Sequence, residues 1–142
     1  MNSAHSQLLY PMLGLVFLNM IVGLRMLFCR VREMRGKRIH PQAAANSVQM
    51  AARLEDVLAA DNFRNLFETP VMFYTLCAIA LATNFVPEWL VIGSWAYVVL
   101  RYLHSYIHCS YNRVMHRLSV FLLSFALLVG MWFAFVLSLP RV

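Results

Sequence analysis

The sequence predicts an all-α integral membrane protein, a bundle of four transmembrane helices in a single domain. Of the 142 residues, 61% are hydrophobic and only 13% are charged, whereas a soluble domain of this size needs a larger polar share to cover its surface. The apolar residues gather in runs, each close to the ~20 residues that cross a hydrocarbon core. The runs are continuous and show no alternation of period two, which favours helices over a β-barrel.

The four predicted spans occupy residues 8–28, 67–85, 89–106 and 118–139, in one domain that covers residues 1–142. The first run ends in arginines without a small-residue cleavage site, so it is predicted to be a retained helix and not a signal peptide. Pro87 allows only a short turn between the second and third spans, which are predicted to pack as an antiparallel hairpin. Pro70 lies in the first turn of the second span, where a proline can kink a helix.

The segment 29–66 connects the first two spans. It begins with a predicted turn over residues 36–41 and becomes rich in alanine from residue 43 onward. Val57 and Leu58 follow Leu54 at i+3 and i+4, a spacing that is typical of an amphipathic helix. We therefore expect a cytoplasmic helix over 43–66 that runs into the second span.

Basic residues mark one side of the predicted bundle. The positive-inside rule places both basic loops in the cytoplasm and both termini outside. The net charge of +6 then reflects membrane asymmetry and not nucleic-acid binding, and anionic lipid headgroups are an alternative contact for the first loop. The basic residues of that loop are Arg30, Arg32, Arg35, Lys37, Arg38 and Arg53, and those of the loop before the fourth span are Arg113 and Arg117.

Polar residues at the start of the second span form the first candidate set. Polar side chains at membrane depth are costly, so they usually face the bundle interior or a cavity. Arg64 and Glu68 are four residues apart and share a helix face, and Asn65 lies beside them. The alternative is a solvated helix end with one surface ion pair. For the neighbouring Asp61, a capping role is the preferred interpretation.

The third span carries the second set. Arg101, His104 and His108 are spaced by three and four, which puts them on one helix face with Asn112 beyond. Two histidines at i and i+4 can chelate a metal, but no third ligand is fixed, so no metal site is predicted. An interhelical hydrogen-bond network is the alternative. A haem is disfavoured because both histidines belong to one helix, whereas bis-histidine ligation usually needs facing helices.

A third set of basic residues lies at the start of the fourth span and consists of Arg113, His116 and Arg117. Arg25 is likewise a basic residue close to the end of a span, in this case the first. Arginines that snorkel to the interface are the alternative here. Together the three sets hold more arginines than carboxylates, and arginine forks suit carboxylates and phosphates. The residues therefore predict a small anionic cofactor that meets a hydrophobic substrate near the cytoplasmic leaflet. The three cysteines form no CxxC motif, so no disulfide framework is expected.

These residues resemble the MAPEG family, the membrane-associated proteins in eicosanoid and glutathione metabolism. The stretch RNLFETP, from Arg64 to Pro70, is similar to the family's signature on its second helix. Arg101 and His104 resemble the third-helix motif of the prostaglandin E synthase branch. Arg117 falls where the family carries an arginine at the start of the fourth helix. The resemblance covers essentially the whole chain.

The resemblance implies a homotrimer that binds glutathione between subunits, near the cytoplasmic ends of the helices. Arg117 would be the catalytic residue and would stabilise the glutathione thiolate, since cationic neighbours lower the pKa of a thiol from about 8.5. The remaining residues that are predicted to bind glutathione are Arg64, Asn65, Glu68, Arg101, His104, His108, Arg113 and Arg25.

The chain also departs from the eicosanoid enzymes, which carry tyrosines where this sequence has His108 and Phe121, and an arginine where it has Asp61. The pattern over residues 104–113 is more similar to bacterial members, so a bacterial inner membrane is the expected location. The predicted function is a glutathione-dependent membrane transferase or peroxidase acting on lipophilic electrophiles. The alternative is a non-catalytic MAPEG-like protein that binds another small anion or a lipid. The expected partners are further copies of the chain, membrane lipid and a lipophilic small molecule, with no nucleic acid.

Overall fold

The structure is a computed structural model that describes residues 3–44, 46–55 and 57–139. Within these ranges all regular structure is helical, as the sequence predicts. Four helices are long: α1 (Ser3–Gly36), α4 (Thr69–Ala82), α5 (Glu88–Cys109) and α6 (Val114–Ser138). Three short helices lie between α1 and α4: η1 (Pro41–Ala44), α2 (Ser47–Ala51) and α3 (Leu58–Asn65).

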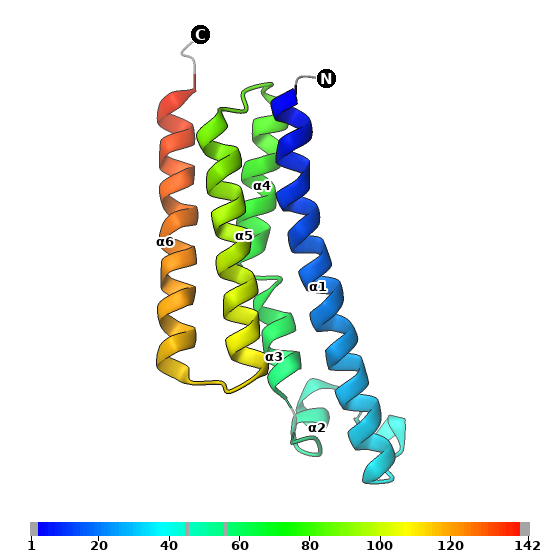
Figure 1. The fold of residues 1–142 in the computed structure, drawn as a ribbon. Helices are drawn as coiled ribbons and strands as arrows, with labels where there is room; N and C mark the ends of the chain where they lie inside the picture. The colour runs from blue at the N-terminus through cyan, green and yellow to red at the C-terminus, as the bar shows by residue number, and fades with distance from the viewer. Residues whose placement is uncertain (1–2, 45, 56, 140–142) are drawn as a thin grey trace.

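The long helices run side by side, with α5 at the centre of the bundle (Figure 1). This helix packs against α1, α3 and α6. Phe73 of α4 stacks on Tyr97 of α5 with 4.9 Å between ring centroids, and both rings are fully buried. The start of α1 and the end of α6 lie at one end of the bundle, and α2 and α3 lie toward the other (Figure 1).

Among the described residues, three helical segments are long and apolar enough to cross a membrane: His5–Gly36, Leu58–Ala82 and Val114–Ser138. The prediction of an all-α membrane bundle is confirmed. With 22 residues α5 also has the length of a span, but Arg101, His104 and His108 lower its hydropathy. Neighbouring helices bury these three side chains, so they are not presented to lipid. A fourth span at α5 stays a prediction.

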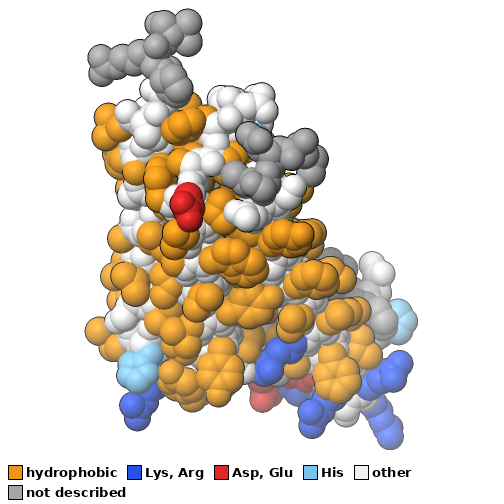
Figure 2. Space-filling model, turned by 45° about the horizontal axis from the view of Figure 1, so that its top comes forward, with side chains coloured by type: hydrophobic (Ala, Val, Ile, Leu, Met, Phe, Trp, Pro, Cys, Tyr) orange, Lys and Arg blue, Asp and Glu red, His pale blue; other side chains and the backbone are white. Residues whose placement is uncertain are grey.

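The outer surface of the bundle is largely hydrophobic, and Lys and Arg side chains gather along its lower rim (Figure 2). Phe28 of α1 and Leu137 of α6 are 66% and 83% exposed, and exposed large apolar residues occur along every long helix. Soluble monomers rarely expose contiguous apolar surface on this scale. Lipid chains or neighbouring subunits must therefore cover it.

The prediction of a single helix over residues 43–66 is wrong, because this segment forms η1, α2 and α3 with turns between them. The Asn46 side chain caps α2, its Oδ1 accepting a hydrogen bond from the Gln49 backbone N–H at 2.9 Å, and a capping asparagine starts a new helix. The sequence pattern over 54–58 continues the helical spacing, but Leu54 is buried in the connection between α2 and α3.

The connection between α1 and α3 is held by ion pairs at the lower rim. Lys37 Nζ lies 2.7 Å from a carboxylate oxygen of Glu33 and 2.7 Å from one of Glu55. Hydrogen bonds to Glu33 and Glu55 hold the pKa of Lys37 above its usual value. The Glu55 backbone N–H also donates to Glu33 Oε1 at 2.8 Å. These contacts tie the connecting segment to the end of α1.

A break between α3 and α4 falls at residues 66–68, immediately before Pro70. In a continuous helix the Leu66 carbonyl would accept from the N–H of residue 70, which a proline lacks. Pro70 instead occupies the first turn of α4, where a missing N–H costs nothing. Pro70 therefore does not kink a continuous helix. It starts a new one, and Glu68 lies in the break that precedes it.

Candidate functional site

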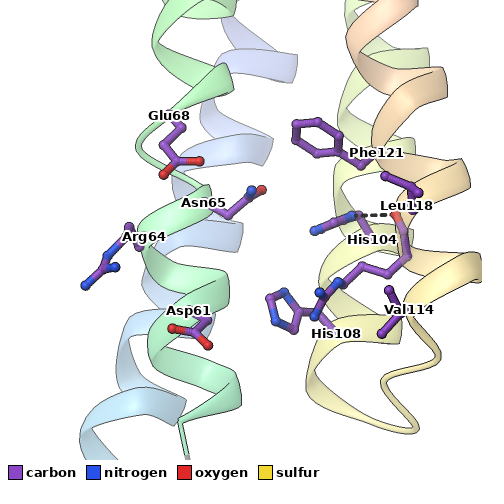
Figure 3. Close-up of a pocket in the computed structure, with 10 residues that line it drawn as sticks. Asp61, Arg64, Asn65, Glu68, His104, His108, Val114, Leu118 and Phe121 are labelled. Carbon is purple, nitrogen blue, oxygen red and sulfur yellow. Dashed lines mark hydrogen bonds between the residues drawn. The ribbon is translucent and has the colours of Figure 1, made fainter. Parts of the chain in front are cut away.

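A cavity of about 330 Å³ lies between two walls of the bundle. α3 and the start of α4 form one wall, and the lower parts of α5 and α6 form the other (Figure 3). The cavity lies in the half of the bundle that holds the basic loops. Its lining residues are Asp61, Arg64, Asn65, Glu68, His104, His108, Val114, Arg117, Leu118 and Phe121.

Arg101 lies behind the cavity and is completely buried. Its Nη2 donates to Asn65 Oδ1 and, at 3.4 Å, to the Asn65 backbone carbonyl, which fastens the break after α3 to the centre of α5. The guanidinium carbon lies 5.9 Å from the centre of the Phe121 ring. Its Nε and Nη1 have no hydrogen-bond partner among the described residues. A buried guanidinium with two free donors is costly unless an acceptor reaches it.

The two histidines of α5 are 3% and 6% exposed, and their rings meet edge to face with centroids 5.8 Å apart. His104 Nδ1 donates to the Arg117 backbone carbonyl at 3.2 Å, because a carbonyl oxygen can only accept. In the neutral ring Nε2 then carries the lone pair. His104 Nε2 and His108 Nδ1 are buried without a partner among the described residues.

Arg117 reaches the cavity from the first turn of α6. Its Nη1 donates to Asn112 Oδ1 at 2.9 Å, and Asn112 has a positive φ of 44° in the turn that follows α5. Asparagine adopts this left-handed conformation more readily than most residues. The α5–α6 turn thereby positions an arginine whose backbone orients His104 and whose guanidinium lines the cavity. Within the described chain Arg117 forms no ion pair with a carboxylate.

The wall formed by α3 and the start of α4 carries the acidic groups. Asp61, Asn65 and Glu68 all line the cavity. Arg64 is exposed and extends away from the opposite wall (Figure 3). Arg64 and Glu68 form no ion pair between them, because the break after Asn65 ends the helical spacing that would bring them together.

Besides Arg101, which lies behind the cavity, two more of the proposed binding residues lie outside it. Arg113 is exposed and precedes the first turn of α6. Arg25 of α1 lies on another side of α5, where its Nη2 donates to the Cys109 carbonyl at 2.6 Å, satisfying a terminal acceptor of that helix. Arg25 lines a second, more apolar cavity of about 270 Å³ with Tyr102 and Tyr106. Within one protomer the structure does not bring Arg25 to the other arginines.

Sequence reasoning missed several cavity residues. It assigned Asp61 to helix capping, although Asp61 is one helical turn before Asn65 and so lies on the same face of α3. Val114, Leu118 and Phe121 form the apolar wall, and their spacing of four and three already places them on one face of α6. Among the described residues, no group of three or more histidine, cysteine, aspartate or glutamate side chains could hold a metal ion.

The fold and the cavity define an integral membrane helical bundle with a polar, arginine-containing site near one end. The MAPEG family model matches residues 8–137, and the chain belongs to this family. The family contains glutathione transferases and peroxidases as well as non-catalytic members. No curated protein and no solved structure gives a significant match.

Proposed function

We propose that this chain is a glutathione-dependent membrane transferase or peroxidase that acts on lipophilic electrophiles. The observation that carries the proposal is the set of unsatisfied nitrogens around the cavity. Arg101 has two donors without a partner, and His104 and His108 each have one such ring nitrogen. A flexible tripeptide with two carboxylates, amide groups and a thiol supplies the acceptors and donors that these buried groups lack.

Each wall has a different part in the proposed activity. Glutathione supplies the nucleophilic or reducing thiol. Arg101 and Asn65 hold its polar backbone, and Arg117 stabilises the thiolate by its positive charge. Val114, Leu118 and Phe121 offer an apolar surface beside Arg117, where a hydrophobic electrophile from the bilayer can meet the sulfur. Positioning and electrostatic stabilisation are then the main contributions of the protein.

The proposal includes assembly and orientation. The active form is a homotrimer with the cavities between subunits on the cytoplasmic side, in a bacterial inner membrane. Two observations support this arrangement. Arg25, which the family pattern assigns to glutathione, is separated from the cavity of its own protomer, and large apolar surfaces remain uncovered in the single chain. A neighbouring copy can supply an arginine and cover those surfaces.

The test is calorimetric titration of the detergent-purified protein with glutathione. Micromolar to millimolar binding is expected, and Arg117→Ala should weaken it by about tenfold, since a charge-assisted hydrogen bond contributes ~1.5–3 kcal/mol. Arg64→Ala tests the exposed arginine of the other wall. Arg35→Ala is the matched control, because Arg35 is an exposed arginine of α1 outside the cavity. It should bind as the wild type does.

Absence of binding at millimolar glutathione, in a protein shown to be folded and oligomeric, would refute the proposed activity. The cavity and its unsatisfied nitrogens would then indicate a non-catalytic member that binds a different small anion or a lipid headgroup. If Arg117→Ala leaves the affinity for glutathione unchanged, Arg117 does not contact glutathione and serves only as an interfacial arginine.

A further inference from the structure

We infer that His108 is the general base of this site and that Asp61, which faces it across the cavity, stabilises the imidazolium that forms. The inference rests on the proposed function and adds to it the destination of the thiol proton. Arg117 can stabilise a thiolate but cannot take the proton, because a guanidinium is already fully protonated. The proton must therefore pass either to solvent or to a second group in the site.

His108 satisfies the geometric requirements of a base. It lines the cavity, its side chain is 94% buried, and Nδ1 has no hydrogen-bond partner among the described residues. It lies on α5 one turn after His104, so the rigid central helix fixes its position. Figure 3 shows the His108 ring directed across the cavity toward Asp61 of α3. A buried ring nitrogen without a partner, in a residue that lines a cavity, favours a hydrogen bond with a bound ligand.

His104 is the competing candidate and is less suited to hold a proton. Its Nδ1 is already committed to the Arg117 carbonyl. It also precedes His108 by one turn toward Arg101, whose buried charge has no carboxylate partner among the described residues. A nearby uncompensated cation disfavours a second positive charge. His104 is therefore an acceptor that orients the ligand, and His108 is the ring that can become charged.

Each helix that borders the cavity contributes charged or titratable groups near it. Asp61 and Arg64 belong to α3, Glu68 precedes α4, His104 and Arg101 belong to α5, and Arg117 belongs to α6. Of the two carboxylates, Asp61 is the one opposite His108, and Glu68 lies higher on the same wall (Figure 3). A facing carboxylate favours the protonated imidazole, whereas burial and the nearby arginines oppose it.

The proton step is balanced within the site. The S–H bond of the thiol breaks, an N–H bond forms on a ring nitrogen of His108, and both electrons of the S–H bond remain on sulfur. The negative sulfur is stabilised by Arg117, and the new imidazolium is stabilised by Asp61. In conjugation, the sulfur then bonds to the electrophilic carbon, and His108 returns its proton to the leaving group or to solvent.

The experiment compares His108→Gln with the wild type in three measurements: glutathione affinity, ultraviolet absorbance of the bound thiolate, and protons released on binding. Proton release is obtained by calorimetry in buffers of different ionisation enthalpy. In the wild type, thiolate should form with little proton release at neutral pH, because His108 keeps the proton. In His108→Gln the thiolate absorbance should be lost or accompanied by release of a proton, and conjugation should slow by about 100-fold.

Two further variants separate a base from a packing residue. In His108→Ala, added imidazole should restore part of the activity, an effect that a purely structural role would not produce. Asp61→Asn should raise the pH at which thiolate forms while glutathione still binds. His116→Gln is the matched control, because His116 is an exposed histidine of α6 outside the cavity that contacts Tyr111. It should change neither the absorbance nor the proton release.

The outcomes distinguish this inference from the proposed function. If His108→Gln binds glutathione with normal thiolate absorbance and unchanged proton release, His108 is not the base. The proposed glutathione activity would be unaffected by that result. No glutathione binding by the wild type would overturn both.

Discussion

Arg101 combines complete burial with incomplete hydrogen bonding, so stability and function should make opposite demands on it. Replacing buried ionic groups by well-packed apolar side chains of similar volume is often neutral or stabilising by ~1–4 kcal/mol. We predict that Arg101→Met raises the free energy of unfolding by about 1 kcal/mol and abolishes glutathione binding. Chemical denaturation in detergent and calorimetry measure the two effects.

Arg101→Lys is the matched variant, because it keeps the charge and loses the planar fork that reaches Asn65. It should bind glutathione weakly without the gain in stability. Strong destabilisation by Arg101→Met would contradict this account, since it would mean that a carboxylate of a neighbouring copy pairs with Arg101 in the assembly.

At the same scale, the sequence predicted most cavity residues from one physical fact, the cost of polar side chains at membrane depth. The predicted residues that line the cavity include Asn65, Glu68, His104, His108 and Arg117. Their exact hydrogen-bond partners were not predictable. The bond from His104 to the Arg117 carbonyl depends on the α5–α6 turn and on the left-handed Asn112, a conformation that no periodicity reveals.

Among the secondary-structure elements, the break between α3 and α4 matters most for the site, because it places Asn65 and Glu68 at the cavity. Pro70→Ala restores an N–H that can bond to the Leu66 carbonyl, so α3 and α4 should join into one helix. Glu68 would then rotate, and we predict a loss of glutathione affinity of about tenfold, equivalent to ~1.4 kcal/mol. Calorimetry and helix content by circular dichroism measure the change.

Pro87→Ala is the control for this prediction, because Pro87 precedes α5 at the opposite end of the bundle. It should leave glutathione affinity unchanged. Equal affinity in Pro70→Ala and the wild type would show that the break is held by tertiary contacts, such as those of Arg101 with Asn65, and not by the proline.

The long helices were predictable because hydrocarbon thickness fixes their length and continuous apolar runs mark them. α6, for instance, was expected over 118–139 and occupies Val114–Ser138. The connecting segment was not predictable in the same way. Its alanine-rich composition suits a helix throughout. The cap at Asn46 instead starts a new helix, and the ion pair between Lys37 and Glu55 ties the segment to the end of α1.

At the scale of the whole molecule, the positions of Arg25 and Arg117 make a prediction about assembly. Arg25 lies against the end of α5 away from the cavity of its own protomer, and Arg117 lines that cavity. If each site takes Arg117 from one copy and Arg25 from its neighbour, Arg25→Ala and Arg117→Ala subunits should each be inactive alone. Coexpressed, they should form mixed trimers in which a site with both arginines is rebuilt.

Such complementation can be measured by purifying mixed trimers through two different affinity tags and assaying glutathione binding and conjugation. In a ring of three copies, either mixed composition contains one junction where an intact Arg117 meets an intact Arg25, so partial recovery is expected. Trimers mixed from two separate preparations of the Arg117→Ala subunit contain no such junction and provide the control. The alternative is that Arg25 serves only its own chain, by donating to the Cys109 carbonyl. In that case Arg25→Ala alone will bind glutathione normally, or mixing will restore nothing, and either result would exclude the shared site.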